Sequence, residues 1–391
     1  MTTTRTELVD SVLHSASGGW RRVTEVVERW GTDAVATVLV DEILFRSEPA
    51  ADCATATVGL ELTHGPARHI TTLGVTQGAR PARTRAAAAD ADVRLECSIA
   101  DLALELYRPD TGRRPDMRVT RFLPGEDHLA PDTERLYRIA RAADAVVSGC
   151  TSHSPGLATL ALRHDSDRCN SLQLSAPHFE RHFRALRGQE VRLLELGIGG
   201  YERPDEGGGS LRMWKHFFPR GQIYGVDVFD KSPLDEDRIT TLRGRQDDRE
   251  FLDRLCRDHG PFDVVIDDGS HCAGDVLAAF EHLYPRLRPG GWYVIEDLSA
   301  SSWARHDGDA APGDSIAAAL AMVNSLRDRM GDRGFGADGG AADLAASLAG
   351  LNLHHNIAFL EKGAGGAGAL PQWISRRPFW NGVTPQVRPA R

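Results

Sequence analysis

The fold is decided by the stretch Arg192-Leu193-Leu194-Glu195-Leu196-Gly197-Ile198-Gly199-Gly200-Tyr201. A short apolar run of strand length ends there in a glycine-rich turn, and the carboxylate of Glu195 lies where the strand ends. In an open α/β sheet, glycines at this point let backbone N–H groups approach a nucleotide-like ligand closely. The stretch therefore predicts the first strand and the ligand-binding turn of a Rossmann-like domain.

A dinucleotide fingerprint is the main alternative for this turn. It requires a third glycine three residues after Gly199, and this chain has Glu202 there. The carboxylate of Glu195 would also repel a pyrophosphate, whereas it suits the amino group or the ribose of a methionine-derived nucleotide. We therefore predict S-adenosylmethionine (SAM) as the ligand, rather than the nicotinamide cofactor of an oxidoreductase.

Composition narrows the class of protein. The 391 residues are enough for two domains, and the net charge of −9 argues against binding to nucleic acid or to an anionic membrane. The acidic balance weakly favours cationic ligands such as a sulfonium or a divalent metal ion. The six cysteines form no CxxC pair, the N-terminal residues lack a signal-peptide pattern, and no segment has the length of a membrane span. We expect reduced thiols and a soluble, cytoplasmic protein.

The first part of the chain predicts a small α+β domain. Helical spacing covers residues 5–46 with an interruption at Gly31, and two alternating segments around a His-Gly-Pro turn form a hairpin pattern. A strand over 93–97, a helix over 99–107 and a helix over 132–148 follow. The run 148–156 is rich in residues that break regular structure, so we predict an auxiliary or oligomerisation domain over 1–150 and a second domain over 156–391.

After this boundary, strands alternate with helices, as a parallel sheet requires. The predicted strands cover 191–196, 222–226, 239–242, 262–266 and 292–295, and the first helix covers 210–217. We further expect a polar loop over 301–312, a helix over 315–330, one late antiparallel strand over 353–361 and a poorly ordered tail from Pro371. The predicted fold class is α/β, with a doubly wound, mostly parallel sheet preceded by the smaller α+β domain.

Carboxylates gather where these strands end, which packing alone does not explain. They are Glu195, Asp227, Asp267, Asp268, Glu296 and Asp297. At the end of the second strand, Asp227 can accept hydrogen bonds from both ribose hydroxyls, although a helix N-cap is an alternative. Gln246 can reach an adenine edge or can be a solvated loop residue.

Three of these acids predict a metal site. Asp268, Glu296 and Asp297 come from adjacent strands, and their charges would repel one another without a cation. An all-oxygen site suits Mg²⁺, with Mn²⁺ not distinguished from it, whereas Zn²⁺ prefers histidine or cysteine. Helix caps and surface salt bridges are the structural alternative. His271, three residues after Asp268, could act as a general base beside the metal, although a lone histidine can also be structural.

The motifs resemble a known family. They are LLELGIGGY (193–201), GGSLRMWKHFFP (208–219), YGVDVFDK (224–231), FDVVIDDGSH (262–271) and PGGWYVIEDL (289–298). Together they are similar to the metal-dependent sugar O-methyltransferases of macrolide and other polyketide biosynthesis, such as those that methylate deoxysugars in mycinamicin, spinosyn and elloramycin-type pathways. The resemblance is strong over the C-terminal half, and members with a long N-terminal domain share the layout of this chain.

This resemblance implies roles for individual residues. Asp268, Glu296 and Asp297 would hold Mg²⁺, and His271 would be the general base. The implied SAM-binding residues are Glu195, Gly197, Gly199, Tyr201, Ser210, Asp227, Gln246, Asp267 and Asp167. The last of these lies in His-Asp-Ser-Asp-Arg at 164–168, where relatives commonly have His-Gly-Thr-Asp-Lys; a simple loop is the alternative there. The family also implies a homo-oligomer, a tetramer or a dimer, whose active sites a neighbouring subunit completes.

The resulting hypothesis is a Mg²⁺- and SAM-dependent O-methyltransferase. Its acceptor would be a hydroxyl of a rhamnose-like deoxysugar on a glycosylated polyketide, with neighbouring hydroxyls chelating the metal. A catechol or another phenolic diol could chelate it in the same way, so a phenolic acceptor stays open. A non-catalytic scaffold with the same fold is disfavoured because all the expected carboxylates and the histidine are present.

Overall fold

The computed structural model describes residues 3–108, 117–122, 133–169, 175–298, 348–354 and 356–363. The chain divides into two compact units. The first comprises Met1–Val191, Ile198–Gly225 and Phe229–Leu242, and the second comprises Arg192–Gly197, Val226–Val228 and Arg243–Arg391. The predicted division into domains over 1–150 and 156–391 remains a prediction. Among the described residues, no helix has both the length and the apolar character needed to cross a membrane.

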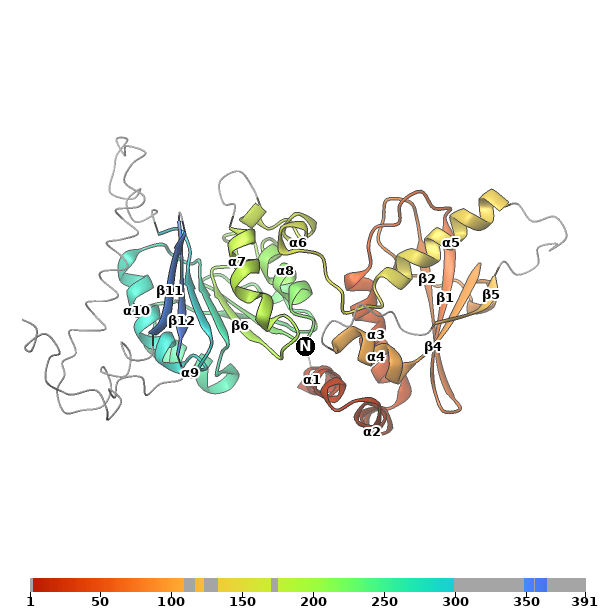
Figure 1. Ribbon diagram of the computed structural model, residues 1–391, viewed down its shortest axis with the longest axis horizontal. Helices are drawn as coiled ribbons and strands as arrows, with labels where there is room; N and C mark the ends of the chain where they lie inside the picture. The colour runs from red at the N-terminus through yellow and green to blue at the C-terminus, as the bar shows by residue number, and fades with distance from the viewer. Residues whose placement is uncertain are drawn as a thin grey trace, which may run out of the picture. The chain divides into compact units, whose positions relative to one another are not determined.

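Three helices open the first unit (Figure 1): α1 (Thr3–Ser17), α2 (Trp20–Trp30) and α3 (Thr32–Arg46). The sequence pattern predicted a continuous helix up to Gly31, and this was wrong. The chain breaks at Gly18 and Gly19 because Gly19 adopts a φ of 77°, which residues with a Cβ rarely adopt. The periodicity of apolar residues continues across such a break, so it did not reveal the turn.

A five-stranded sheet follows these helices, in the order β3-β2-β1-β4-β5. Its strands are β1 (Ala56–His64), β2 (Ala67–Val75), β3 (Ala82–Arg83), β4 (Val93–Ser98) and β5 (Arg118–Phe122). The predicted hairpin is confirmed, with Leu62 opposite His69, and β1 also pairs in parallel with β4. The helix α4 (Ile99–Tyr107) begins where predicted, because the side chain of Ser98 caps the backbone N–H of Asp101. The helix α5 (Thr133–Ser148) packs on β1, β2 and β4.

A seven-stranded sheet has the order β11-β12-β10-β9-β6-β7-β8. Its strands are β6 (Arg192–Leu196), β7 (Gln222–Asp227), β8 (Ile239–Arg243), β9 (Val264–Asp267), β10 (Trp292–Ile295), β11 (Leu348–His354) and β12 (Ile357–Lys362). Strand β9 is buried along its whole length and pairs in parallel with both β6 and β10, as expected for the centre of a doubly wound sheet. The Rossmann-like sheet of the prediction is therefore confirmed.

The end of this sheet corrects one prediction. A single strand was expected over 353–361, but β11 and β12 form an antiparallel hairpin, and β12 pairs with β10. The sequence between Leu353 and Ile357 contains no glycine or proline, so the strongest turn signals were absent there. The loop expected over 301–312, the helix over 315–330 and the tail from Pro371 lie outside the described residues.

The remaining helices connect these strands: α6 (Leu157–Arg163), α7 (Ala176–Phe183), α8 (Gly209–Phe217), α9 (Arg249–His259) and α10 (Ala273–Leu283). The predicted helix over 210–217 is confirmed as α8. Its Trp214 packs against Phe179 and Phe183 of α7, so these aromatic side chains are part of the core.

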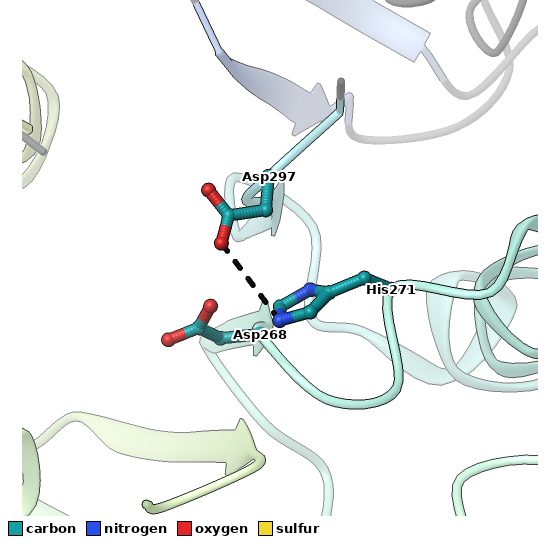
Figure 2. Close-up of side chains that lie close together, drawn as sticks. All are labelled: Asp268, His271 and Asp297. Atoms are coloured by element: carbon teal, nitrogen blue, oxygen red, sulfur yellow. Dashed lines mark ion pairs between the residues drawn. The ribbon is translucent and has the colours of Figure 1, made fainter. Parts of the chain in front are cut away.

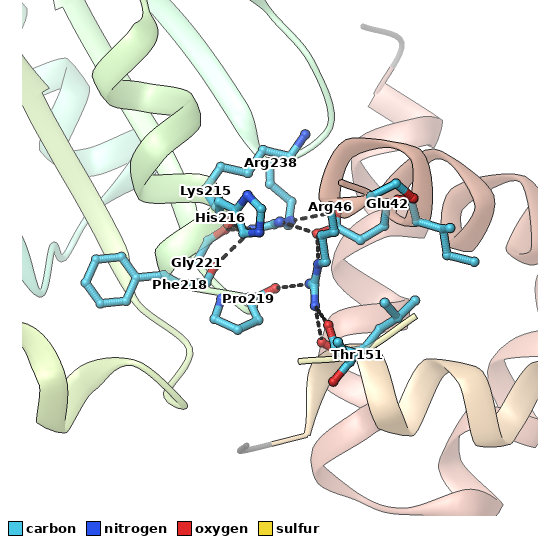
Figure 3. A network of polar contacts seen from close by, with 12 residues as sticks. Glu42, Arg46, Thr151, Lys215, His216, Phe218, Pro219, Gly221 and Arg238 are labelled. Atoms are coloured by element: carbon cyan, nitrogen blue, oxygen red, sulfur yellow. Dashed lines mark hydrogen bonds and ion pairs between the residues drawn. The ribbon is translucent and has the colours of Figure 1, made fainter. Parts of the chain in front are cut away.

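A buried polar network links α3 to the segment around α8 within the first unit (Figure 3). The carboxylate of Glu42 accepts from Arg238 Nη2 at 2.6 Å and from Arg46 Nε at 2.7 Å. Arg238 also donates to three carbonyls at and beyond the end of α8, those of Lys215, Phe218 and Gly221. Burial by itself would raise the pKa of Glu42, but the charges of Arg238 and Arg46 outweigh it and hold that pKa far below its usual range.

Candidate active site

Three polar side chains meet in the second unit (Figure 2). Asp268 follows β9, His271 follows three residues later, and Asp297 follows β10. One ligand atom from each lies within 4.8 Å of the others, and Nε2 of His271 is 3.8 Å from Oδ2 of Asp297. The side chains are partly exposed, at 33% for His271 and 16% for Asp297, so a small ligand can reach them. The adjacency of β9 and β10 in the sheet explains why strand-end residues separated in sequence lie together.

Backbone conformation singles out the same region. Among the described residues, six that are not glycine have a positive φ, namely Asp52, Asp165, Tyr201, Arg238, His271 and Asp297. His271 (φ 54°) and Asp297 (φ 50°) thus both adopt the left-handed region, which side chains with a Cβ populate at some cost in free energy. Such conformations are concentrated at functional sites. The local backbone therefore supports a functional interpretation of the cluster.

Glu296 lies next to this cluster in sequence but is not a member of the group that the structure brings together. Its exposed fraction is 4%, and its backbone N–H donates to the carbonyl of Asp267. A metal-binding role for Glu296 remains a prediction.

Asp267 and Gln246 form a buried hydrogen-bonded unit beside the cluster. Nε2 of Gln246 donates to Asp267 Oδ1 at 3.1 Å, its Oε1 accepts from the N–H of Ser270 at 2.8 Å, and the hydroxyl of Tyr293 donates to Asp267 Oδ2 at 3.2 Å. Burial raises the pKa of Asp267 to about 7, against the lowering effect of these hydrogen bonds. Gln246 thereby fixes the loop that leads to His271, and its contact with adenine remains a prediction.

Other predicted cofactor residues in the second unit lie on β6 and β7. Glu195 is completely buried in β6, and Asp227 ends β7 with its backbone carbonyl accepting from Gly244. Gly197 has a φ of 82°, and a Cβ there would overlap the carbonyl of Asp268, so the turn and the cluster loop are in close contact. Only glycine satisfies both conditions at position 197.

The first unit contains the remaining predicted cofactor residues, Gly199, Tyr201, Ser210 and Asp167. Tyr201 is 79% exposed with a φ of 45°, and Ser210 lies in the first turn of α8. Asp167 is exposed in a 3₁₀ turn, after a segment whose carbonyls at 164 and 165 approach Gly209 at the start of α8. The polar loop over 164–168 thus lies at the helix that follows the glycine-rich turn.

Two residues beside these were not predicted. Lys231, which is 2% exposed, donates from Nζ to the carbonyls of Arg203 at 2.7 Å and Glu206 at 3.0 Å, and so holds the loop that follows the glycine-rich turn. In the second unit, Asn356 donates to Asp297 at 2.7 Å. Lys231 is in the YGVDVFDK motif and could have been noticed there, whereas no local pattern marks Asn356.

The chemistry of the cluster fits a hard divalent cation. The two carboxylates offer oxygen ligands with room for water or substrate oxygens, which suits Mg²⁺ or Mn²⁺, and the imidazole lies beside them. A fully thiolate or multi-histidine set, which a structural Zn²⁺ site would use, is not what these three residues provide. The arrangement can hold a cation and place a basic nitrogen beside it.

Comparisons with known proteins agree with the fold. Residues 9–118 match the family model described as MycE methyltransferase N-terminal, and residues 207–298 match a methyltransferase domain model. The chain is 42% identical to demethylmacrocin O-methyltransferase of Streptomyces fradiae over 94% of each protein. It is 40% identical to 8-demethyl-8-(2-methoxy-alpha-L-rhamnosyl)-tetracenomycin-C 3'-O-methyltransferase of Streptomyces olivaceus, over 91% of this chain and 93% of that one.

A solved structure is similar over nearly the whole chain. It is the MycE methyltransferase of the mycinamycin pathway in complex with Mg, S-adenosylhomocysteine (SAH) and mycinamycin VI, with a TM-score of 0.80 and 37% identity over 95% of this chain and 96% of that one. The fold and these matches define a SAM-dependent O-methyltransferase. More narrowly, the chain belongs to the MycE-type family of sugar O-methyltransferases of macrolide and polyketide deoxysugar tailoring.

Proposed function

We propose that this enzyme transfers the methyl group of SAM to a hydroxyl of a rhamnose-like deoxysugar on a glycosylated polyketide, with Mg²⁺ as the working metal. The observation that carries the proposal is the grouping of Asp268, His271 and Asp297 at the ends of β9 and β10. Support for the substrate comes from similar proteins, one named for a rhamnosyl tetracenomycin and one solved with a macrolide.

The proposed roles divide the residues into two groups. Asp268 and Asp297 hold the cation together with Glu296, and His271 is the base. The residues that bind SAM are Glu195, Gly197, Gly199, Tyr201, Ser210, Asp227, Gln246, Asp267 and Asp167. When bound, Mg²⁺ supplies positive charge that favours the alkoxide form of a sugar hydroxyl.

The chain's own residues carry the proton and orient the reactants. Nε2 of His271 takes the proton of the acceptor hydroxyl, and Asp297, 3.8 Å away, stabilises the imidazolium that forms. The hydroxyl oxygen then forms a bond to the sulfonium methyl carbon while the carbon–sulfur bond breaks. The electron pair of the broken carbon–sulfur bond stays on sulfur, and SAH leaves. Much of the acceleration is expected from holding the two reactants in line.

The test is a methyl-transfer assay with the full-length protein, SAM and a panel of acceptors. The panel contains a rhamnosylated polyketide, its aglycone and a catechol, each with and without EDTA. Transfer to the sugar alone, lost with EDTA and restored by Mg²⁺, supports the proposal. Transfer to the catechol but not to the sugar overturns the substrate class, and EDTA-resistant transfer overturns the metal.

Two variants connect the assay to the cluster. Asp268→Asn keeps the shape of the side chain and removes its charge, so it should abolish most of the activity without changing SAM affinity. Asp275→Asn is a matched control on α10, because Asp275 accepts from Ser270 but is not in the cluster. Equal activity of wild type and Asp268→Asn would contradict the assignment of the site.

We also propose a homo-oligomer, a tetramer or a dimer, with a domain over 1–150 that contributes to assembly and to the substrate pocket. Light scattering on the purified chain measures the mass directly. A monomer that is fully active would overturn this part of the proposal and leave the chemistry untouched.

A further inference from the structure

The turn between β11 and β12 contacts the segment after β10 at two points. The side-chain Nδ2 of Asn356 donates to Oδ1 of Asp297 at 2.7 Å, and the backbone carbonyl of Asn356 accepts from the N–H of Leu298 at 3.2 Å. The two bonds act on neighbouring residues. They therefore hold the backbone at the end of β10 and the carboxylate of Asp297 at the same time.

Strand register explains why Asn356 is in this place. Ile295 of β10 lies opposite Ala358 of β12, and these strands are antiparallel. Asp297 lies two residues after Ile295, beyond the end of β10, and Asn356 lies two residues before Ala358, in the turn before β12. The pairing of β12 with β10 therefore brings the turn that contains Asn356 beside the segment that contains Asp297.

The direction of the hydrogen bond divides the two oxygens of Asp297 between separate tasks. Oδ1 accepts from Asn356, while Oδ2 faces His271 at 3.8 Å. Rotation of the carboxylate would break the bond to Asn356, so the amide fixes which oxygen faces the cluster. Asp297 has a strained φ of 50°, and the bond from Leu298 to Asn356 holds the backbone next to it.

We propose that Asn356 is a positioning residue for the metal site, an inference that rests on the proposed function. It acts through Asp297 and does not itself contact the cation or the substrate. Hydrogen-bonding partners of metal ligands typically change metal affinity or activity about 10- to 100-fold when they are removed. The C-terminal hairpin is therefore required for full metal affinity, although it lies 59 residues after the ligand that it orients.

The test is a titration of Mn²⁺ into the full-length protein in the absence of SAM and acceptor. The EPR signal of the free ion measures how much Mn²⁺ is bound. Asn356→Ala and Asn356→Leu both remove the donor, and the leucine keeps a similar branched shape. Both should weaken Mn²⁺ binding about 10- to 100-fold. Asn352→Ala, in β11 of the same hairpin, is the matched control and should bind Mn²⁺ like the wild type.

Further measurements separate positioning from loss of structure. SAM affinity and the thermal midpoint should stay near the wild-type values in Asn356→Leu. In an Asp297→Ala background, Asn356→Leu should cause no additional loss of Mn²⁺ affinity, because its effect passes through that carboxylate. An equal loss in both backgrounds overturns the inference.

The outcomes also distinguish this inference from the proposed function. If the wild type binds Mn²⁺ and Asn356→Leu binds it equally well, the positioning role is wrong and the metal site stands. If the wild type binds no Mn²⁺, the metal site itself is wrong, and the inference is overturned with it.

Discussion

The cluster of Asp268, His271 and Asp297 (Figure 2) and the network around Glu42 (Figure 3) both place carboxylates beside basic side chains. In the network, the side chains of Glu42 and Arg46 are 4% exposed and that of Arg238 is 0% exposed, with pair distances of 2.6 to 2.7 Å. In the cluster, His271 is 33% exposed and lies 3.8 Å from Asp297. The network is closed and saturated with hydrogen bonds, whereas the cluster is open to a ligand.

This difference in burial indicates that the network contributes to stability, whereas the cluster contributes to the chemistry. A buried charge is tolerated only where partners compensate for its lost hydration, so removing one member of the network leaves another uncompensated. A partly exposed cluster of acids beside an imidazole loses little stability when one member is removed, but it loses the arrangement that a ligand needs. The comparison predicts which substitutions affect turnover and which affect folding.

The largest effect is expected on turnover, from His271→Asn. Asparagine adopts a positive φ more readily than most residues, so the backbone at 271 should keep its conformation. Loss of the base should lower kcat about 10²- to 10⁴-fold in the methyl-transfer assay. The thermal midpoint should stay within a few degrees of the wild-type value. A large fall in the midpoint together with normal turnover of the folded fraction would show that His271 is structural.

For Glu42→Gln we expect the opposite result, a loss of stability with normal turnover. This substitution leaves Arg238 buried without its counter-charge and should lower the free energy of unfolding by about 3 to 5 kcal/mol. Urea unfolding followed by circular dichroism measures it. Below the unfolding transition, kcat should remain close to the wild-type value, because Glu42 takes no part in the proposed chemistry. A loss below about 1 kcal/mol would mean that solvent reaches Arg238 and replaces the carboxylate.

Acidification should weaken the first unit through a histidine pair next to this network. Nε2 of His164 lies 3.2 Å from Nδ1 of His216, and the ring of Phe45 stacks on His164. Burial, followed by the charge of Arg80, lowers the pKa of His164 to about 3, and burial lowers that of His216 well below its usual value. The fold therefore keeps both rings neutral when the unfolded chain already binds protons.

The direction in which stability changes with pH follows from proton binding. Below pH 6.5 the unfolded state binds more protons than the folded state, so stability is fully present above that pH and falls as the pH is lowered towards 3. The slope is at most about 1.4 kcal/mol per pH unit for each ring. Urea unfolding at pH 7, 6 and 5 should show a steeper loss in the wild type than in a His164→Gln/His216→Gln variant. Equal slopes would show that these rings do not set the acid sensitivity.

The site residues that follow the strands could be predicted because each is marked by the sequence directly around it. Asp268 and His271 belong to one short motif directly after an apolar strand, and Asp297 lies two residues after the end of another strand. The rule that parallel strands present their carboxyl ends at one edge is enough to bring such residues together. For the same reason, the mostly parallel sheet and the helix α8 could be predicted from alternation and spacing.

Long-range pairings could not be predicted in this way. Arg238 and Glu42 are 196 residues apart, and Asn356 depends on the register of a hairpin whose turn has no glycine or proline. One signal was available for the network. In α3, Glu42 and Arg46 are four residues apart among apolar residues, a pattern that indicates a buried charge pair needing another partner. Which residue supplies that partner is decided by tertiary packing.

The smallest effect on stability is expected for an ion pair that has the same separation as the buried pair but is exposed to solvent. Arg141 Nη1 lies 2.6 Å from Asp52 Oδ2, the same distance as between Arg238 and Glu42, but the two side chains are 59% and 67% exposed. Water screens such a pair and the flexible arginine loses entropy when it is held in place, so Arg141→Ala should change the free energy of unfolding by less than about 0.5 kcal/mol. The same urea titration that tests Glu42→Gln measures it. If Arg141→Ala lowered the free energy of unfolding as much as Glu42→Gln, the separation of the charges alone would set the strength of an ion pair. The contrast between the closed network and the open cluster would then lose its physical basis.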